Sequence, residues 1–184
     1  IPYIEAYGEG EAQAAYLVEN GDAWAVASQD YDCLLFGAKR VVRNLAINSN
    51  LGDLEYYNLK RVLDELGINR EQLIDMGILI GTDFSEGLKG VGAKTALKLA
   101  KKGELENKLA KLQEESSHDI SEVREIFLNH NVNKDYKIRW KKPAKNDIID
   151  FLCEEHGFSQ DRVSKACDKL KNLNSSQKSL EDWF

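Results

Sequence analysis

The sequence predicts an α/β core followed by a helical extension. Two short apolar runs that favour strands, AWAVAS (23–28) and VVRNL (41–45), lie among segments with helical spacing in the first part of the chain. From residue 70 onward, helical periodicity dominates. Strands mixed with helices, and then helices alone, are typical of an α/β domain with a helical region appended to it.

The individual elements follow from periodicity and from glycine stops. The opening segment, IPYIEAY, is strand-like and is expected to continue something longer, and LEYYNL (54–59) is a candidate third strand. Glycines at 21, 67 and 81 mark predicted helix ends. Helices are expected at 9–20, 58–66, 70–80, 93–102, 104–114, 121–128, 146–156 and 159–171. A basic extended stretch at 137–143 precedes the last two helices, and a polar linker at 172–176 follows them.

The charge distribution is uneven. The net charge is −6, but residues 1–38 contain seven acids and no Lys or Arg, whereas residues 84–112 contain seven lysines and three acids. This pattern suits an enzyme that binds metal ions in one place and a phosphate backbone in another, although solvated helix faces would also produce it. The three cysteines lack C-x-x-C spacing and the histidines are scattered, which argues against disulfides and zinc. No apolar run reaches the length of a membrane span, so we expect a cytosolic protein without a membrane partner.

Five acidic residues stand beside apolar segments. Asp30 and Asp32 directly follow the predicted strand 23–28, and in an extended segment both side chains would face one ion. An Asx cap in a polar turn is the alternative for this pair. Glu9 and Glu11 begin a helix, where they would meet the helix dipole; both reach one site only if Glu9 precedes the helix. Asp83 follows the apolar helix 70–80, and is otherwise an N-cap. Such carboxylates suit Mg²⁺, two ions of which, about 4 Å apart, can promote phosphodiester cleavage.

A glycine-rich turn precedes the lysine-rich helix at 93–102. Gly87 and Gly92 have P-loop spacing, but Ala93 separates Gly92 from Lys94–Thr95 and no strand leads into the turn, so nucleotide binding is rejected. Helix, hairpin and helix is the better interpretation, in which close glycines let the backbone approach a phosphate. An αα-hairpin with an exposed basic face is the alternative. Five lysines surround the turn: Lys89, Lys94, Lys98, Lys101 and Lys102.

The end of the chain has a short aromatic motif after the polar linker. Leu180, Trp183 and Phe184 would share one face of a helical turn, preceded by Gln177. Exposed aromatic anchors of this kind indicate a peptide that docks on a partner. A tail that folds back on its own domain is the alternative.

Taken together, these segments resemble the C-terminal half of an archaeal or eukaryotic-type flap endonuclease, a family of the structure-specific 5′ nuclease superfamily. The resemblance runs from Ile1 to Phe184 and rests on six segments: EGEAQAAYL, WAVASQDYDCLLFGAKRVVRNL, LIDMGILIGTDF, GLKGVGAKTAL, QKSLEDWF and the opening IPYIEA. It implies an incomplete PIN-like nuclease core at 1–83, a helix–hairpin–helix and helical region at 84–171, and a linker with a clamp-binding tail at 172–184.

The resemblance also implies roles for particular residues. Catalytic carboxylates would bind two Mg²⁺ ions, with Mn²⁺ as a substitute, at Glu9, Glu11, Asp30, Asp32 and Asp83. Backbone carbonyls near Gly87, Leu88 and Val91 would hold a monovalent cation such as K⁺. Duplex DNA would bind at Lys89, Gly90, Gly92, Lys94 and Thr95. The sliding clamp PCNA would bind the tail at Gln177, Leu180, Trp183 and Phe184.

The function implied is a 5′ flap endonuclease and 5′–3′ exonuclease acting on branched DNA with a 5′ flap in replication, at Okazaki fragments, and in repair. Tyr7–Gly8 stands where the family usually has Pro-Ser, which affects the turn that aims Glu9. The N-terminal half of the nuclease, with further carboxylates and the helical arch, is absent, so the isolated chain is expected to be weakly active or inactive. A non-catalytic module that binds DNA and a clamp is the alternative function. The resemblance implies an archaeal nucleoid-associated or a eukaryotic nuclear location.

Overall fold

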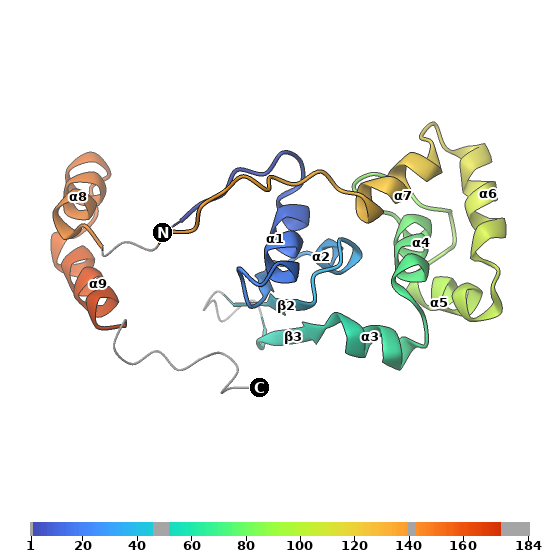
Figure 1. The fold of residues 1–184 in the computed structure, drawn as a ribbon, viewed down its shortest axis with the longest axis horizontal. Coiled ribbons are helices and arrows are strands. Elements are labelled where there is room, and N and C mark those ends of the chain that lie inside the picture. The colour runs from blue at the N-terminus through green and yellow to red at the C-terminus, as the bar shows by residue number, and fades with distance from the viewer. Residues whose placement is uncertain (1, 46–51, 140–142, 174–184) are drawn as a thin grey trace. The chain divides into compact units, whose positions relative to one another are not determined.

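A computed structural model describes residues 2–45, 52–139 and 143–173 of the chain (Figure 1). Ile4–Tyr136 form one compact unit, and the described residues on either side of it form a second. The elements in chain order are α1 (Gly10–Glu19), β1 (Val26–Ala27), α2 (Asp32–Leu35), β2 (Arg40–Arg43), β3 (Glu55–Asn58), α3 (Leu59–Leu66), α4 (Arg70–Ile80), α5 (Ala93–Lys102), α6 (Leu105–Glu115), α7 (Ile120–Leu128), α8 (Lys145–Ile149), the π-helix η1 (Asp150–Glu155) and α9 (Gln160–Leu173).

The described strands form a small mixed sheet in the order β1-β2-β3. β1 runs parallel to β2, with Val26 opposite Val41, and β2 runs antiparallel to β3, with Arg43 opposite Glu55. α1 and α2 pack together beside the sheet, and α1 also contacts β1. The carboxyl ends of β1 and β2 therefore lie at one edge, where open α/β sheets place their sites.

α4 is the centre of the helical part of this unit. It contacts α2 on the sheet side and α5, α6 and α7 on the other (Figure 1). Its side chains Ile74, Ile78 and Leu79 are fully buried, and the helix begins with a reciprocal capping box between Asn69 and Gln72. One continuous hydrophobic core therefore contains residues of the sheet and of the helices, from before and after residue 83. The predicted boundary at residues 83–84 lies inside this compact unit. The proposed division of the chain stays a prediction.

The α/β fold class is confirmed, and most predicted helices begin and end within one or two residues of the observed ones. Two strand predictions differ from the structure. The strand expected at 23–28 is only two residues long, because it pairs with β2 only at Val26 and Ala27. Residues 2–7 form no strand; the backbone carbonyl of Glu5 accepts instead from the Asn133 side chain, at 3.0 Å.

The helix expected at 146–156 is observed as one helical stretch of two kinds. The short α8 is followed directly by the π-helical η1. The rings of Phe151 and His156, five residues apart, stack edge to face with their centroids 4.5 Å apart, a spacing that a π-helix brings onto one face. In the same unit α9 packs against α8, with Val163 and Cys167 buried.

Candidate functional site

Four of the predicted carboxylates act on the fifth, Asp32. Burial, together with the charges of Asp30, Asp83, Glu11 and Glu9, raises the pKa of Asp32 to about 6. Charge interactions weaken with distance and with exposure to water. The structure therefore brings side chains from residues 9 to 83 to one region at the carboxyl edge of the sheet.

Glu9 and Glu11 reach this region from the start of α1. Glu9 is the N-cap residue, with an extended backbone (φ −68°, ψ 134°), and Glu11 lies in the first helical turn. Glu9 thus precedes the helix, which is the arrangement that lets both side chains approach one site. Farther along α1, the buried side chain of Gln13 donates to the carbonyl of Asn133 at 2.9 Å and accepts from its N–H at 2.7 Å, which ties α1 to the segment after α7.

Asp30 and Asp32 do not lie in an extended segment, so that part of the sequence interpretation was wrong. Tyr31 between them has helical backbone angles, and Asp32 is the first residue of α2. The Asp32 N–H donates to Oδ1 of Asp30 at 3.0 Å, and the Asp30 N–H donates to the Ser28 hydroxyl at 3.1 Å. The pair therefore combines an Asx-type turn with proximity to the other acids, because the chain enters α2 immediately after β1.

Asp83 lies in the turn that follows α4, between Thr82 and Ser85, which form an isolated bridge. Its side chain is exposed, and the next helix begins only at Ala93, so it is not an N-cap. This turn also places Phe84 against Phe127 of α7, with ring centroids 5.6 Å apart. Packing of α4 and of this turn against α7 therefore sets where Asp83 stands relative to α1 and α2.

The donor set fits a hard divalent cation in its chemistry. All five side chains offer carboxylate oxygen, which Mg²⁺ prefers, and no Lys or Arg in the described part of the chain forms an ion pair with any of them. Among the same described residues, however, no three His, Cys, Asp or Glu side chains are close enough together to hold one ion. The five residues thus supply suitable ligands but not a complete site.

The glycine hairpin packs on the C-terminal end of α4. Gly87 has a positive φ of 72°, and a Cβ there would lie 2.6 Å from the backbone oxygen of Ile80. The Leu88 N–H donates to the Leu79 carbonyl at 2.9 Å, and the buried Ser85 hydroxyl donates to the Ile78 carbonyl at 3.1 Å. Only glycine at position 87 lets the hairpin approach the helix this closely.

The far side of the hairpin opens onto the N-terminus of α5. Gly92 is the N-cap residue, and neither Gly90 nor Gly92 has any atom within 4 Å of the position that a Cβ would occupy. The first N–H groups of a helix have no acceptor within the helix and attract anions. Lys89, Lys94 and Thr95 are exposed around this terminus, so an extended phosphate backbone can approach it.

The residues predicted to hold a monovalent cation through their carbonyls, Gly87, Leu88 and Val91, belong to this hairpin. Leu88 is buried and Val91 packs against the core, and the Val91 N–H donates to the Leu88 carbonyl at 3.0 Å. These contacts order the turn from Gly87 to Val91. Cation binding there stays a prediction.

Known proteins are similar to this chain in sequence. Residues 1–83 match the XPG I-region family. Over its full length the chain is 98% identical to Flap endonuclease 1 of Methanobrevibacter smithii and 55% identical to Flap endonuclease 1 of Methanothermobacter thermautotrophicus. The chain is similar to flap endonucleases over its whole length. It spans about half the length of these relatives, 56% of each.

Solved structures of this and related nucleases have the same fold. Flap endonuclease-1 from Methanococcus jannaschii is 43% identical and superimposes with a TM-score of 0.85 over 96% of this chain and 55% of that one. Human GEN1, solved with Holliday junction DNA, is 26% identical and has a TM-score of 0.77 over 97% of this chain and 52% of that one. The partial α/β nuclease core expected from the sequence is therefore confirmed.

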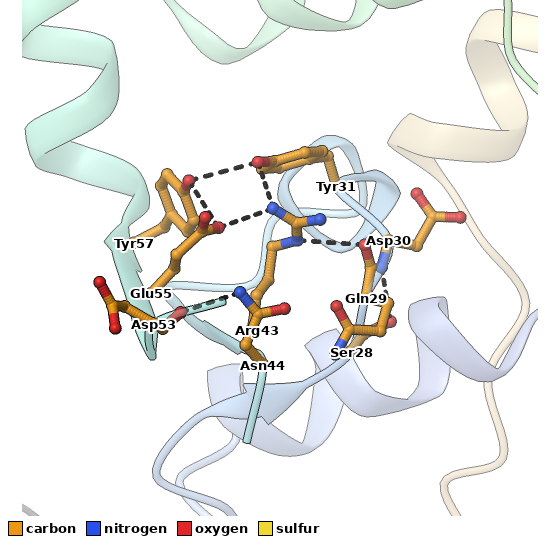
Figure 2. A network of polar contacts seen from close by, with 9 residues as sticks. All are labelled: Ser28, Gln29, Asp30, Tyr31, Arg43, Asn44, Asp53, Glu55 and Tyr57. Atoms are coloured by element: carbon orange, nitrogen blue, oxygen red, sulfur yellow. Dashed lines mark hydrogen bonds and ion pairs between the residues drawn. The ribbon is translucent and has the colours of Figure 1, made fainter. Parts of the chain in front are cut away.

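Four residues near the carboxylates were not among the predicted site residues. Tyr31, Arg43, Glu55 and Tyr57 form a polar network beside Asp30 (Figure 2). Arg43 lies within the predicted strand VVRNL, and the structure makes it the last residue of β2, at the same edge as Asp30. The partners in β3 become visible only once the strands are paired.

The predictions for the C-terminal tail and for membrane spans remain to be compared with the structure. The residues of the predicted clamp-binding tail, Gln177, Leu180, Trp183 and Phe184, lie outside the described residues. The helices that the structure describes include none with the length and apolar character needed to span a bilayer.

Proposed function

We propose that this chain is the C-terminal portion of a magnesium-dependent endonuclease that cuts DNA at 5′ flaps. The observation that carries the proposal is the convergence of four carboxylates on Asp32, without a neutralising cation from the described part of the chain. Uncompensated negative charge at the carboxyl edge of an α/β sheet favours binding of a divalent cation. Similarity to flap endonucleases over the whole chain supports the same assignment.

Within this proposal Glu9, Glu11, Asp30, Asp32 and Asp83 hold Mg²⁺, or Mn²⁺ in its place, as part of a two-ion site. Bound Mg²⁺ would supply charge stabilisation to the phosphate and lower the pKa of a water molecule. The role of the chain is to collect the ligands. Because the pKa of Asp32 is about 6, protons compete with metal ions at this side chain below that pH. The remaining ligands would come from the part of the family's length that this chain does not cover.

The hairpin would hold the duplex next to the cut. The N-terminus of α5, with Lys89, Lys94 and Thr95 exposed around Gly90 and Gly92, offers N–H groups and positive charge to phosphates. Such contacts position DNA without reading its sequence. A monovalent cation such as K⁺, bound by carbonyls near Gly87, Leu88 and Val91, would strengthen the contact with phosphate.

The biological setting is part of the same proposal. A flap endonuclease would act in replication, at Okazaki fragments, and in repair, and the tail at 177–184 would dock on the sliding clamp PCNA. Deleting Trp183 and Phe184 should remove clamp binding and leave the affinity for flap DNA unchanged. Unchanged clamp binding by this variant would eliminate the docking role.

The catalytic role is tested in the Methanobrevibacter smithii relative, which is 98% identical across the whole chain. The 184 residues of the chain would replace the matching stretch of that protein. With the double change Asp30→Asn, Asp32→Asn we expect flap cleavage in Mg²⁺ to fall by about 10³-fold or more, while DNA binding stays within a factor of about three. The matched control is Asp64→Asn, an exposed acid on α3 that pairs only with Lys60 in the described residues.

The same experiment also tests the second candidate function, a non-catalytic module that binds DNA and a clamp. That candidate draws support from the absence, within the described residues, of any three acids close enough to hold an ion. Full cleavage by the double variant would remove the carboxylates from catalysis. No cleavage by the unmodified hybrid, with DNA binding intact, would favour the binding module.

A further inference from the structure

The turn that carries Asp30 and Asp32 is held by side chains from two other strands. Tyr31, which separates the two aspartates, points toward Arg43 at the end of β2 and Tyr57 of β3 (Figure 2). Two members of this network, Glu55 and Tyr57, lie outside the segments by which the carboxylates were identified.

Arg43 contacts the turn at three points. Its Nε donates to the backbone carbonyl of Gln29 at 3.1 Å, its Nη1 donates to the Tyr31 hydroxyl, and its guanidinium lies 4.0 Å from the centre of the Tyr31 ring. One planar group thus contacts the backbone just before Asp30 and the side chain just after it. Arginine suits this role because its fork of donors is rigid and its flat face stacks on aromatic rings.

Arg43 is itself held in place from β3. Nη1 forms an ion pair with Glu55 Oε2 at 2.6 Å, and Glu55 lies directly opposite Arg43 in the antiparallel pair. The Tyr57 hydroxyl donates to the same oxygen at 3.0 Å and lies 3.3 Å from the Tyr31 hydroxyl. The Arg43 side chain is only 18% exposed, so the ion pair is shielded more than an ordinary surface pair.

The bonds within the turn are local. The N–H groups of Asp30 and Asp32 donate to side chains two residues earlier, and the Leu34 N–H donates to the Tyr31 carbonyl at 2.9 Å. Both aspartates lie in or next to a single helical turn rather than in a long element. We propose that Arg43, braced by Glu55 and Tyr57 and stacked on Tyr31, is a positioning residue that sets the distance and orientation of Asp30 and Asp32. The inference rests on the proposed function, in which these aspartates are metal ligands. Residues that orient metal ligands typically contribute a factor of about 10 to 100 in metal affinity.

The test compares Arg43→Gln, Arg43→Lys and Tyr31→Phe with the control Arg61→Gln in the same full-length hybrid, in which the 184 residues of the chain replace the matching stretch of the Methanobrevibacter smithii relative. Arg61 is the matched control because it also pairs with a glutamate, Glu65, but on the exposed face of α3. Amide hydrogen exchange over residues 29–35 reports the order of the turn without any metal, and electron paramagnetic resonance of free Mn²⁺ reports metal binding. Thermal unfolding reports global stability.

We expect Arg43→Gln to accelerate exchange of the Asp32 and Leu34 amides and to weaken Mn²⁺ binding by about tenfold. Arg43→Lys keeps the charge but loses the fork and the stacking, so it should recover little of either property. Tyr31→Phe keeps the ring and should have a smaller effect in the same direction. Arg61→Gln should change neither readout. If Arg43→Gln does not fold, Tyr31→Phe and Arg43→Lys carry the comparison.

The readouts separate failure of this inference from failure of the proposed function. If Asp32→Asn weakens Mn²⁺ binding while Arg43→Gln and Arg43→Lys alter neither exchange nor affinity, the positioning role is overturned and the metal site stands. If Asp32→Asn leaves Mn²⁺ binding unchanged, the metal role of the carboxylates fails. Uniformly faster exchange throughout Ile4–Tyr136 in Arg43→Gln would show a merely structural role and would also overturn the inference.

Discussion

The carboxylate region and the glycine hairpin are built in opposite ways. The carboxylates come from the start of α1, the turn before α2 and the turn after α4, so they meet only when the sheet and α4 have packed. The hairpin from Gly87 to Gly92 is continuous in sequence, and its shape follows from glycines at positive φ next to one helix end. The first region is acidic and held by contacts between distant segments, whereas the second is basic and mostly self-contained. A local change should therefore damage the hairpin most severely, and long-range contacts should control the carboxylates.

The largest effect is expected at the contact between the hairpin and α4. In Gly87→Ala the new Cβ would meet the backbone of Ile80 at 2.6 Å, in addition to the strain of a φ of 72°. We expect the free energy of unfolding to fall by about 3 kcal/mol, measured by urea denaturation. Gly103→Ala is the matched control, because its φ is 69° and nothing lies within 4 Å of its Cβ position. That variant should lose only about 1 kcal/mol. Equal losses in the two variants would show that the close approach to α4 contributes nothing.

A smaller effect, an increase in the free energy of unfolding, is expected from a substitution in the carboxylate region. Asp32 has a folded pKa of about 6 against an ordinary value of 3.8, so the folded state binds its proton more tightly between these values. Its contribution to stability is therefore present below pH 3.8 and is lost as the pH rises through about 6. In metal-free buffer at pH 8, Asp32→Asn should raise the free energy of unfolding by about 1 kcal/mol, after allowance for solvent screening of a half-buried group.

The pH dependence of the same variant gives the control. The pKa of Asp75 is also raised to about 6, because burial outweighs the opposite effect of its ion pair with Arg124. Part of the dependence of the free energy of unfolding on pH should therefore persist in Asp32→Asn. The difference between the two unfolding curves belongs to Asp32. A difference that does not change between pH 4 and pH 8 would contradict the crowding of charges around Asp32.

The smallest effect is expected at the basic side of the hairpin. Lys94→Gln removes one exposed charge from the first turn of α5. Affinity for duplex DNA should fall by about threefold at physiological salt, and the slope of log affinity against log salt should decrease by about 1. Lys111→Gln on α6, whose lysine pairs with Glu115, is the control. Fluorescence anisotropy over a salt series measures both quantities, and identical slopes for the two variants would remove Lys94 from the interface.

The sequence predicted the helices well because their apolar spacing is local. The glycine stop predicted at Gly67 is observed in the structure, where Gly67 is the left-handed C-cap of α3. The extended conformation assigned to Asp30 and Asp32 was wrong, because α2 begins at Asp32 against α1 and α4, and no pattern of four residues reveals that contact. The length of β1 was overestimated for the same kind of reason, since a strand ends where its partner no longer pairs with it.

The sequence by itself determined the fold class, the positions of most helices, the identity of the five acidic residues and the glycine hairpin, because periodicity, charge and glycine geometry act within short segments. Only the tertiary structure decided that Glu9 precedes α1 while Glu11 lies within it, that Asp32 is crowded by four other carboxylates, and that Arg43 reaches across to Tyr31 from beside Glu55. These relations depend on strand pairing and on the packing of α1, α2 and α4. They join residues that are distant in sequence, and so no single segment of the chain encodes them.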